Sequence, residues 1–310
     1  MTRVAAIDCG TNTVKLLVAD LDPATGSEDE LVREMRMVRL GQDVDRTGRL
    51  ADQALERVFG AIDEYAALIS AHDVDALRFC ATSAARDANN AAVFASGVEA
   101  RLGVVPEVVS GDEEAQLSYD GATRSLVGGE HPAPFLVVDI GGGSTELILG
   151  DGHGHVRSAH SLDIGSVRMT ERYLSSDPPT ADEVAAATTS IALALDSLTA
   201  HGVALDEAST LVGVAGTITT VAAMVLDLRS YERERIHHAE LPVPAVHAAA
   251  ERLLTMTHEQ RKALPFMHPG RADVIGAGAL ILDRALMRTT VDSMLVSEAD
   301  ILDGIAWSIG

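Results

Sequence analysis

Two short glycine-rich turns carry the residues best suited to chemistry in this chain. The first, Asp8–Thr13, reads Asp-Cys-Gly-Thr-Asn-Thr and follows the apolar run Val4–Ile7. The second, Asp139–Glu146, reads Asp-Ile-Gly-Gly-Gly-Ser-Thr-Glu and follows the apolar run Phe135–Val138. A turn of this kind can direct several backbone N–H groups and a hydroxyl towards one anion. Because each turn also begins with an acid, the pair predicts a cleft that holds a phosphate chain together with a metal ion.

The carboxylates at the two turns suit a divalent cation. Asp8 precedes the first turn, and Asp139 and Glu146 lie on opposite sides of Gly141–Gly143, so that a hairpin would bring these two acids close together. Magnesium prefers oxygen ligands and is usually held by one or two carboxylates with substrate phosphates and water. The alternative is that all three are ordinary acids at strand ends.

A cluster of acids follows the predicted strand that ends at Val109. The segment Ser110–Ala115 reads Ser-Gly-Asp-Glu-Glu-Ala and begins a predicted helix. A carboxylate in the first helical turn is stabilised by the positive end of the helix dipole. It therefore stays ionised near neutral pH, as a base that orients or deprotonates water must be. A plain acidic helix start is the competing interpretation.

Two more junctions between a strand and a helix could contact an anion. At the first, Ser83 and Arg86 offer a hydroxyl, a helix N-terminus and a guanidinium. A capping serine with a surface arginine would look the same. At the second, Gly213–Thr220, small residues allow a ligand to approach the backbone, although close packing of helix on sheet explains them equally well.

The elements that must position these residues occur in two similar series. The segment 127–134 is rich in Gly and Pro and is the best linker candidate, which predicts domains at 1–126 and 127–310. Each series begins with three strands around a glycine turn and continues with alternating helices and strands, so we expect an α/β fold with mixed sheets flanked by helices. Whether the final helix packs back on the first domain is left open. The expected strands are 4–7, 14–20, 31–40, 77–81, 104–109, 135–139, 146–149, 156–162, 210–214 and 294–297, and the expected helices are 51–71, 87–102, 112–126, 181–200 (with Thr180 as N-cap), 218–228, 244–254, 274–288 and 299–309.

The charge balance limits the partners that the protein can have. The 310 residues carry 24 Lys and Arg against 46 Asp and Glu, a formal net charge of −22. This argues against a nucleic-acid binder, which normally presents a basic face. An acidic protein also repels polyanions at long range. A phosphate site would therefore depend on bound metal and on local cations, chiefly Lys15 and Arg86.

Other features point to a cytoplasmic protein without a membrane segment. No cationic, apolar leader is visible at the N-terminus, and the apolar run 211–226 is shorter than a membrane span. Cys9 and Cys80 lie in apolar strand contexts, which predicts buried free thiols.

Other kinds of site are disfavoured by the sequence. Neither glycine turn ends in the Gly-Lys-Ser/Thr of a P-loop, which argues against a P-loop NTPase. The histidines lack the spacing of a metal site, and no Ser-His-Asp set is evident.

Taken together, the motifs resemble the exopolyphosphatase/guanosine pentaphosphate phosphatase family of the actin-like ATPase superfamily, in its short form without C-terminal helical domains. The resemblance covers essentially the whole chain and implies two actin-like (ribonuclease H-like) domains with the active site in the interdomain cleft. One departure is that the family's Leu-Arg-Glu-Gly near the C-terminus reads Ile-Leu-Asp-Gly at 301–304. The motifs that carry the resemblance are 8–13, 81–89, 111–115, 138–146, 165–171, 215–217 and 269–273.

This resemblance implies a Mg²⁺-dependent exopolyphosphatase, with Mn²⁺ as a second candidate metal. Glu114, with Glu113 beside it, would activate the attacking water, and Asp139 and Glu146 would hold the metal. The terminal phosphates would be bound by Asp8, Gly10, Thr11, Asn12, Thr13, Lys15, Ser83, Arg86, Gly141, Gly142, Gly143, Ser144, Thr145, Gly216 and Thr217.

Several alternatives stay open at this point. The same chemistry could act on pppGpp as a 5′-phosphohydrolase, or the chain could bind (p)ppGpp without turnover. A sugar or acyl kinase is a further rival, because the first turn also fits that superfamily. A homodimer is compatible with the sequence. The preference for polymer length and the need for a monovalent cation are not readable from it.

Overall fold

The computed structural model describes residues 1–309, which divide into two compact units. Met1–Gly121 and the segment that begins at Ile301 form the first unit, and Ala122–Asp300 forms the second. The C-terminal helix thus belongs to the first unit, a point that the sequence left open.

The first unit is built on a mixed sheet of five strands in the order β3-β2-β1-β4-β5. β1 pairs antiparallel with β2, which pairs antiparallel with β3, while β4 runs parallel to both β1 and β5. Parallel pairing places the ends of β1 and β4 side by side, with Cys9 opposite Ala81. The strands are β1 (Thr2–Cys9), β2 (Thr13–Asp22), β3 (Ser27–Met37), β4 (Ala76–Ala81) and β5 (Glu107–Val108).

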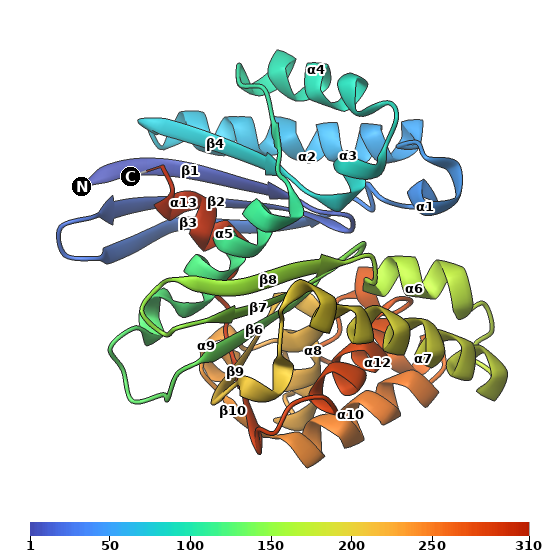
Figure 1. Ribbon diagram of the computed structural model, residues 1–310. Helices are drawn as coiled ribbons and strands as arrows, with labels where there is room; N and C mark the ends of the chain where they lie inside the picture. The colour runs from blue at the N-terminus through green and yellow to red at the C-terminus, as the bar shows by residue number, and fades with distance from the viewer. Residues whose placement is uncertain (310) are drawn as a thin grey trace. The chain divides into compact units, whose positions relative to one another are not determined.

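Helices cover both faces of this sheet (Figure 1). Successive side chains of a strand point to opposite faces. Ala5 and Ile7 of β1 accordingly share one core with α2 (Asp52–Ala71) and α4 (Ala91–Leu102). Val4 and Ala6 share the other with α5 (Gly111–Thr123) and α13 (Ile301–Trp307). The short helices α1 (Val44–Thr47) and α3 (Ser83–Asp87) complete the first unit.

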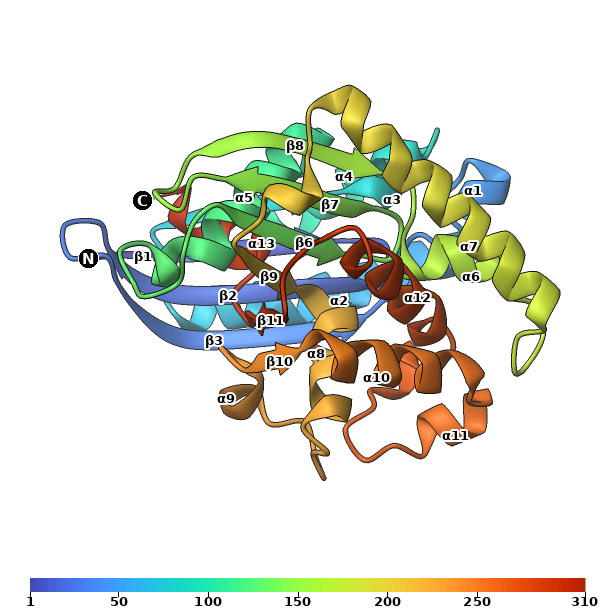
Figure 2. The same cartoon turned by 60° about the horizontal axis from the view of Figure 1, so that its bottom comes forward.

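The second unit contains a mixed sheet of six strands in the order β10-β11-β9-β6-β7-β8. β6 pairs antiparallel with β7 and parallel with β9, so the ends of β6 and β9 lie side by side. Figure 2 shows α8, α10 and α12 packed together. The strands are β6 (Phe135–Ile140), β7 (Thr145–Gly150), β8 (Val156–Leu162), β9 (Thr210–Val214), β10 (Glu240–Pro242) and β11 (Ser293–Val296). The helices are η1 (Arg124–Leu126), α6 (Ser166–Tyr173), α7 (Ala181–Asp196), η2 (Ser197–His201), η3 (Leu205–Glu207), α8 (Ala215–Val225), α9 (Arg233–Ile236), α10 (Val243–Thr255), α11 (His258–Lys262), η4 (Pro269–Arg271) and α12 (Ile275–Leu286).

The α/β class with mixed sheets flanked by helices is confirmed, but some predicted bounds were wrong. The helix expected at 87–102 is confirmed as α4 but begins only at Ala91, after the separate short helix α3, because Asn90 forms tertiary bonds. Its side chain accepts from the Leu50 N–H at 2.8 Å and donates to the Leu50 carbonyl at 3.0 Å. The strand expected at 31–40 ends at Met37, because the N–H groups of the next two residues bind the Asn12 carbonyl of the first glycine turn.

Thr180 caps α7 as expected, in a capping box with Glu183. Hydrogen bonds lower the pKa of Glu183 from 4.5 to about 2, first from the Ser175 hydroxyl and then from the Thr180 N–H.

This lowered pKa makes the stability of the fold depend on pH. A carboxyl group whose pKa is lower in the folded than in the unfolded protein stabilises the fold at pH values above the unfolded-state pKa. The stabilisation is lost as the pH falls through the folded-state pKa. Glu183→Gln should therefore lower Tm at pH 7, and the deficit should shrink towards pH 2. An equal deficit at both pH values would contradict this, and Glu251→Gln on α10 is the exposed control.

Both cysteines are free and buried, as the sequence predicts. Burial raises the pKa of Cys80 to about 12, so this thiol is unreactive near neutral pH. Among residues 1–309, none of the helices combines the length and the hydropathy that a membrane crossing requires.

Candidate active site

The first glycine turn is held by backbone bonds and by its neighbour at the end of β4. The Gly10 N–H donates to the Thr13 carbonyl at 2.9 Å, which closes the turn. The hydroxyls of Thr11 and Ser83, both buried, lie 2.9 Å apart. Lys15 Nζ lies 3.4 Å from Asp8 Oδ2. The pairing of β1 with β4 thus brings two predicted phosphate-binding segments together, although they are far apart in the sequence.

Glu114 belongs to the same unit and contacts the α3 segment. Its side chain is on the first turn of α5 and is only 7% exposed. Arg86 Nη1 donates to Glu114 Oε2 at 2.9 Å and to the Val109 carbonyl at 3.0 Å. Arg86 therefore connects Glu114 with the helix that begins at Ser83.

Glu113 has different partners from Glu114. Its carboxylate accepts from Arg78 Nη2 at 2.7 Å, and the same nitrogen donates to Glu107 at 2.7 Å. The Glu113 side chain is 45% exposed. Consecutive helical residues point about 100° apart, and here the two acids bind different arginines. The structure places Glu114, rather than Glu113, beside the predicted phosphate-binding residues.

The second glycine turn pairs the two candidate metal ligands directly. Asp139 of β6 is opposite Glu146 of β7 in the antiparallel register, and both are buried. Side chains that are directly opposite in this way share one face of the sheet, with Cβ atoms about 5 Å apart. Ser161 on β8 donates its hydroxyl to Glu146 Oε1 at 2.7 Å. Paired carboxylate oxygens fit Mg²⁺ chemically. Among residues 1–309, no cluster of three or more Asp, Glu, His or Cys is arranged to hold a metal.

Helix α6, which the sequence did not predict, orients the second turn. Its N–H groups at 166–168 donate to the carbonyls of Gly141 and Gly142 at 2.9–3.1 Å, and Arg168 Nε donates to the Gly143 carbonyl at 2.7 Å. In a trans peptide the C=O and the following N–H point in opposite directions. The N–H groups that follow these carbonyls, at 142–144, therefore point away from α6, where they can bind an anion.

The hydroxyl of Thr145 is engaged within its own unit. It donates to the Ile164 carbonyl at 2.5 Å, and Thr145 is fully buried. Thr145, which was predicted to bind phosphate, therefore uses its hydroxyl inside the fold.

The third predicted segment, Gly216–Thr217, forms the start of α8 at the end of β9. Asp139 is opposite Val214 in the parallel register, so this segment adjoins the second turn. Arg271 packs directly on Gly216: an added Cβ there would lie 2.7 Å from Arg271 Nε. Sequence reasoning recognised the motif around Arg271 but gave this arginine no role. The residues around Arg271 give no local signal of this neighbour, which is distant in the sequence.

Comparison with known proteins places the chain in a family. The model of the Ppx/GppA phosphatase family matches residues 21–309. The chain belongs to the Ppx/GppA phosphatase family. It is 46% identical over its whole length to a protein named Exopolyphosphatase 2 from Mycobacterium tuberculosis, of which it covers 99%.

Solved structures support the same placement of this Ppx/GppA protein. The crystal structure of an exopolyphosphatase-like protein has a TM-score of 0.95 and 43% identity, with 100% of this chain and 98% of that chain covered. The Aquifex aeolicus family member has a TM-score of 0.82 and 31% identity, with 99% and 97% covered. These likenesses confirm the actin-like fold that the resemblance implied.

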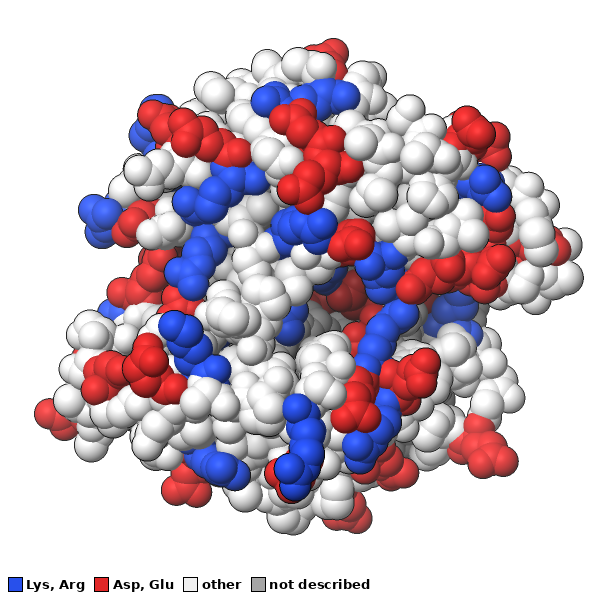
Figure 3. All heavy atoms as spheres, turned by 180° about the vertical axis from the view of Figure 1, so that it is seen from behind, with Lys and Arg blue, Asp and Glu red and all other residues white. Residues whose placement is uncertain are grey.

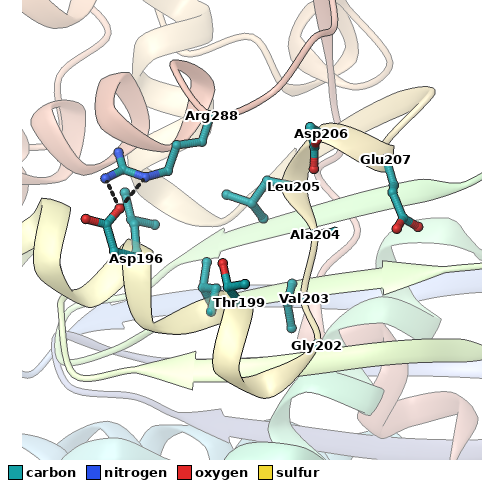
Figure 4. Close-up of a pocket in the computed structure, with 11 residues that line it drawn as sticks. Asp196, Thr199, Gly202, Val203, Ala204, Leu205, Asp206, Glu207 and Arg288 are labelled. Carbon is teal, nitrogen blue, oxygen red and sulfur yellow. Dashed lines mark hydrogen bonds and ion pairs between the residues drawn. The ribbon is translucent and has the colours of Figure 1, made fainter.

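A cavity of about 530 Å³ in the second unit of this Ppx/GppA protein is lined by none of the predicted site residues (Figure 4). Its walls come from the end of α7, the segment 202–207 and Arg288. Arg288 is paired with Asp196 at 2.7 Å, and Asp206 and Glu207 add negative charge. This surface is therefore poorly suited to a phosphate chain.

A substitution at Gly165 tests whether α6 holds the second glycine turn of this phosphatase in place. An added Cβ would lie 2.5 Å from the Gly142 carbonyl carbon and 2.6 Å from that of Gly143. Gly165→Ala should therefore displace the second turn, reduce phosphatase activity and destabilise the protein by about 1–3 kcal/mol, as overpacking does. Gly60→Ala is the control, because a Cβ there meets nothing within 4 Å. Equal activity and urea midpoints for the two variants would contradict the prediction.

Proposed function

We propose that this Ppx/GppA protein is an exopolyphosphatase, which hydrolyses the terminal phosphate of inorganic polyphosphate. The observation that carries the proposal is the chain of contacts from the first glycine turn to a buried carboxylate. Thr11 contacts Ser83 at the start of α3, and Arg86 at the end of α3 binds Glu114. A base thus lies beside a predicted phosphate-binding turn. The name of the M. tuberculosis relative supports the choice of substrate.

In this proposal Glu114 orients or deprotonates a water that attacks the terminal phosphorus in line. The transition state spreads negative charge over the phosphoryl oxygens, and catalysis depends on groups already placed to stabilise that charge. The proposed groups are Lys15, Arg86 and the N–H groups at 142–144. Arg86 has a second function in this proposal, because its bond to Glu114 orients this carboxylate.

Asp139 and Glu146 are the proposed holders of Mg²⁺, with Mn²⁺ as a substitute. Their pairing across β6 and β7 supports this assignment, and Ser161 orients Glu146. When bound, the metal would neutralise charge on the phosphate oxygens.

The surface charges support a site that depends on local groups. On the face seen in Figure 3, Lys and Arg side chains lie beside Asp and Glu side chains and form no broad basic area. Among the ion pairs of the structure, those of Arg36, Arg46 and Arg78 each bring a guanidinium within 3.0 Å of a carboxylate. With a net charge of −22, the protein offers polyphosphate little long-range attraction. Binding should therefore depend on the metal and on the few cations at the turns.

Hydrolysis of the 5′ phosphate of pppGpp is the alternative for the same residues. The assigned groups would all act at a terminal phosphate, so they do not distinguish the two substrates. Phosphate release from short polyphosphate, long polyphosphate, pppGpp and ATP with Mg²⁺, measured side by side, tests the choice. The proposal requires polyphosphate to have the highest kcat/KM. Saturable binding of (p)ppGpp without release would indicate a binding protein, and phosphate transfer from ATP to an acceptor would indicate a kinase.

We also propose that the protein works in the cytoplasm, which its two buried free thiols support. The homodimer stays a prediction that sedimentation equilibrium can test.

A further inference from the structure

The C-terminal helix α13 touches the helix that carries Glu114 through backbone atoms. At Gly304, an added Cβ would lie 2.7 Å from the carbonyl carbon and 3.1 Å from the Cα of Leu117, and closer still to the Leu117 carbonyl oxygen. Real Cβ atoms do not approach backbone this closely. Only a residue without a Cβ allows α13 and α5 to pack at this separation.

The contact lies on the catalytic side of α5. Leu117 follows Glu114 by three residues, so the two are on the same face of the helix, one turn apart. The Leu117 side chain is buried in a core with Ile301, Leu302 and Ile305 of α13. A helical turn is stiff, and a displacement of Leu117 would therefore displace the Glu114 carboxylate as well.

Polar bonds hold α13 against the sheet of the first unit. Asp303 is buried and accepts from Arg33 of β3, and Trp307 Nε1 donates to Glu28 Oε2 at 2.9 Å. Arg78 of β4 donates to the Ser308 hydroxyl at 2.7 Å. The same guanidinium binds Glu113 on the first turn of α5 at 2.7 Å. Arg78 therefore joins the end of α13 to the start of α5.

We propose that Gly304 is a positioning residue, which sets the place of α5 and hence the aim of Glu114. This inference rests on the proposed role of Glu114 as the base. It gives α13 a function in catalysis, although none of its residues needs to contact substrate.

The test is a double-mutant cycle between Gly304→Ala and Glu114→Gln. A misplacement of a catalytic group by about 1 Å can cost up to about 100-fold in rate. We expect Gly304→Ala to lower kcat for polyphosphate by roughly 10- to 100-fold on this scale, with little change in KM. If Gly304 acts through Glu114, the substitution should have almost no further effect on kcat in the Glu114→Gln background. Gly60→Ala on α2, where a Cβ meets nothing within 4 Å, is the matched control.

The possible outcomes distinguish the proposed role of Glu114 as the base from the proposed role of Gly304 as a positioning residue. If Glu114→Gln lowers kcat but Gly304→Ala lowers it by the same factor in both backgrounds, Gly304 is merely structural and the inference is wrong. If Glu114→Gln leaves kcat unchanged, the proposed base and this inference both fail. If circular dichroism shows that Gly304→Ala does not fold, Arg78→Gln enters the same cycle, because it removes the polar bridge from Ser308 to Glu113 without adding atoms. An equal effect of Arg78→Gln in both backgrounds would overturn the inference.

Discussion

Replacing Glu114 by glutamine is expected to lower kcat for phosphate release from polyphosphate by about 100-fold or more, the usual range for a general base. Glutamine keeps the shape of the side chain but cannot accept a proton from water. KM should change little, because the groups that hold the phosphates remain. The measurement is steady-state release of inorganic phosphate at saturating Mg²⁺, with thermal unfolding to show that the variant is folded.

Two companion variants make the result specific. Glu56→Gln, on the exposed side of α2, is the matched control and should behave as the unsubstituted protein does. Glu113→Gln should lose much less activity than Glu114→Gln, because the Glu113 carboxylate binds Arg78. Turnover close to normal in Glu114→Gln would show that another group activates the water.

Removal of the metal should have the second large effect. Without Mg²⁺, polyphosphate binding is expected nearly to vanish, because the protein and the polymer are both strongly negative. Asp139→Asn should raise the Mg²⁺ concentration for half-maximal activity by at least about 100-fold. Ser161→Ala, which removes a bond to Glu146, should raise it by about 10- to 100-fold, as is typical for groups that orient metal ligands.

Isothermal titration calorimetry provides the measurement. Polyphosphate is titrated into the protein with Mg²⁺ and again in excess chelator, and Asp182→Asn on the exposed first turn of α7 is the control for Asp139→Asn. Tight binding in chelator, or an unchanged Mg²⁺ requirement in Asp139→Asn, would contradict the assignment of the metal site.

Local patterns in the sequence predict much of this protein. A strand, an acid and a glycine turn are recognisable from a few adjacent residues, and so is the N-cap of α7 at Thr180. The order of these patterns predicts the α/β class and the mixed sheets. The seven motifs, taken together along the chain, also identified the family that the comparisons confirm.

Local patterns fail where a residue's partner is distant in the chain. Helix α6 was missed because it has only eight residues, most of them polar. Its first N–H groups are bound by carbonyls of the second glycine turn, which the local sequence does not show. The helix expected at 87–102 begins later than predicted, at Ala91, for a similar reason, since Asn90 bonds to Leu50. In both places a tertiary hydrogen bond outweighs the local propensity.

The sequence by itself determined which residues could perform phosphate chemistry, because residue type and short spacing decide what a turn or a helix start can bind. Only the tertiary structure decided how these residues are used. Glu113 and Glu114 are adjacent in sequence, yet Arg78 binds one and Arg86 binds the other. The place of α13 beside α5 likewise depends on a backbone contact between Gly304 and Leu117. The register of the strands and the close approach of two helix backbones produce these contacts, and the sequence does not show which residues will be brought together.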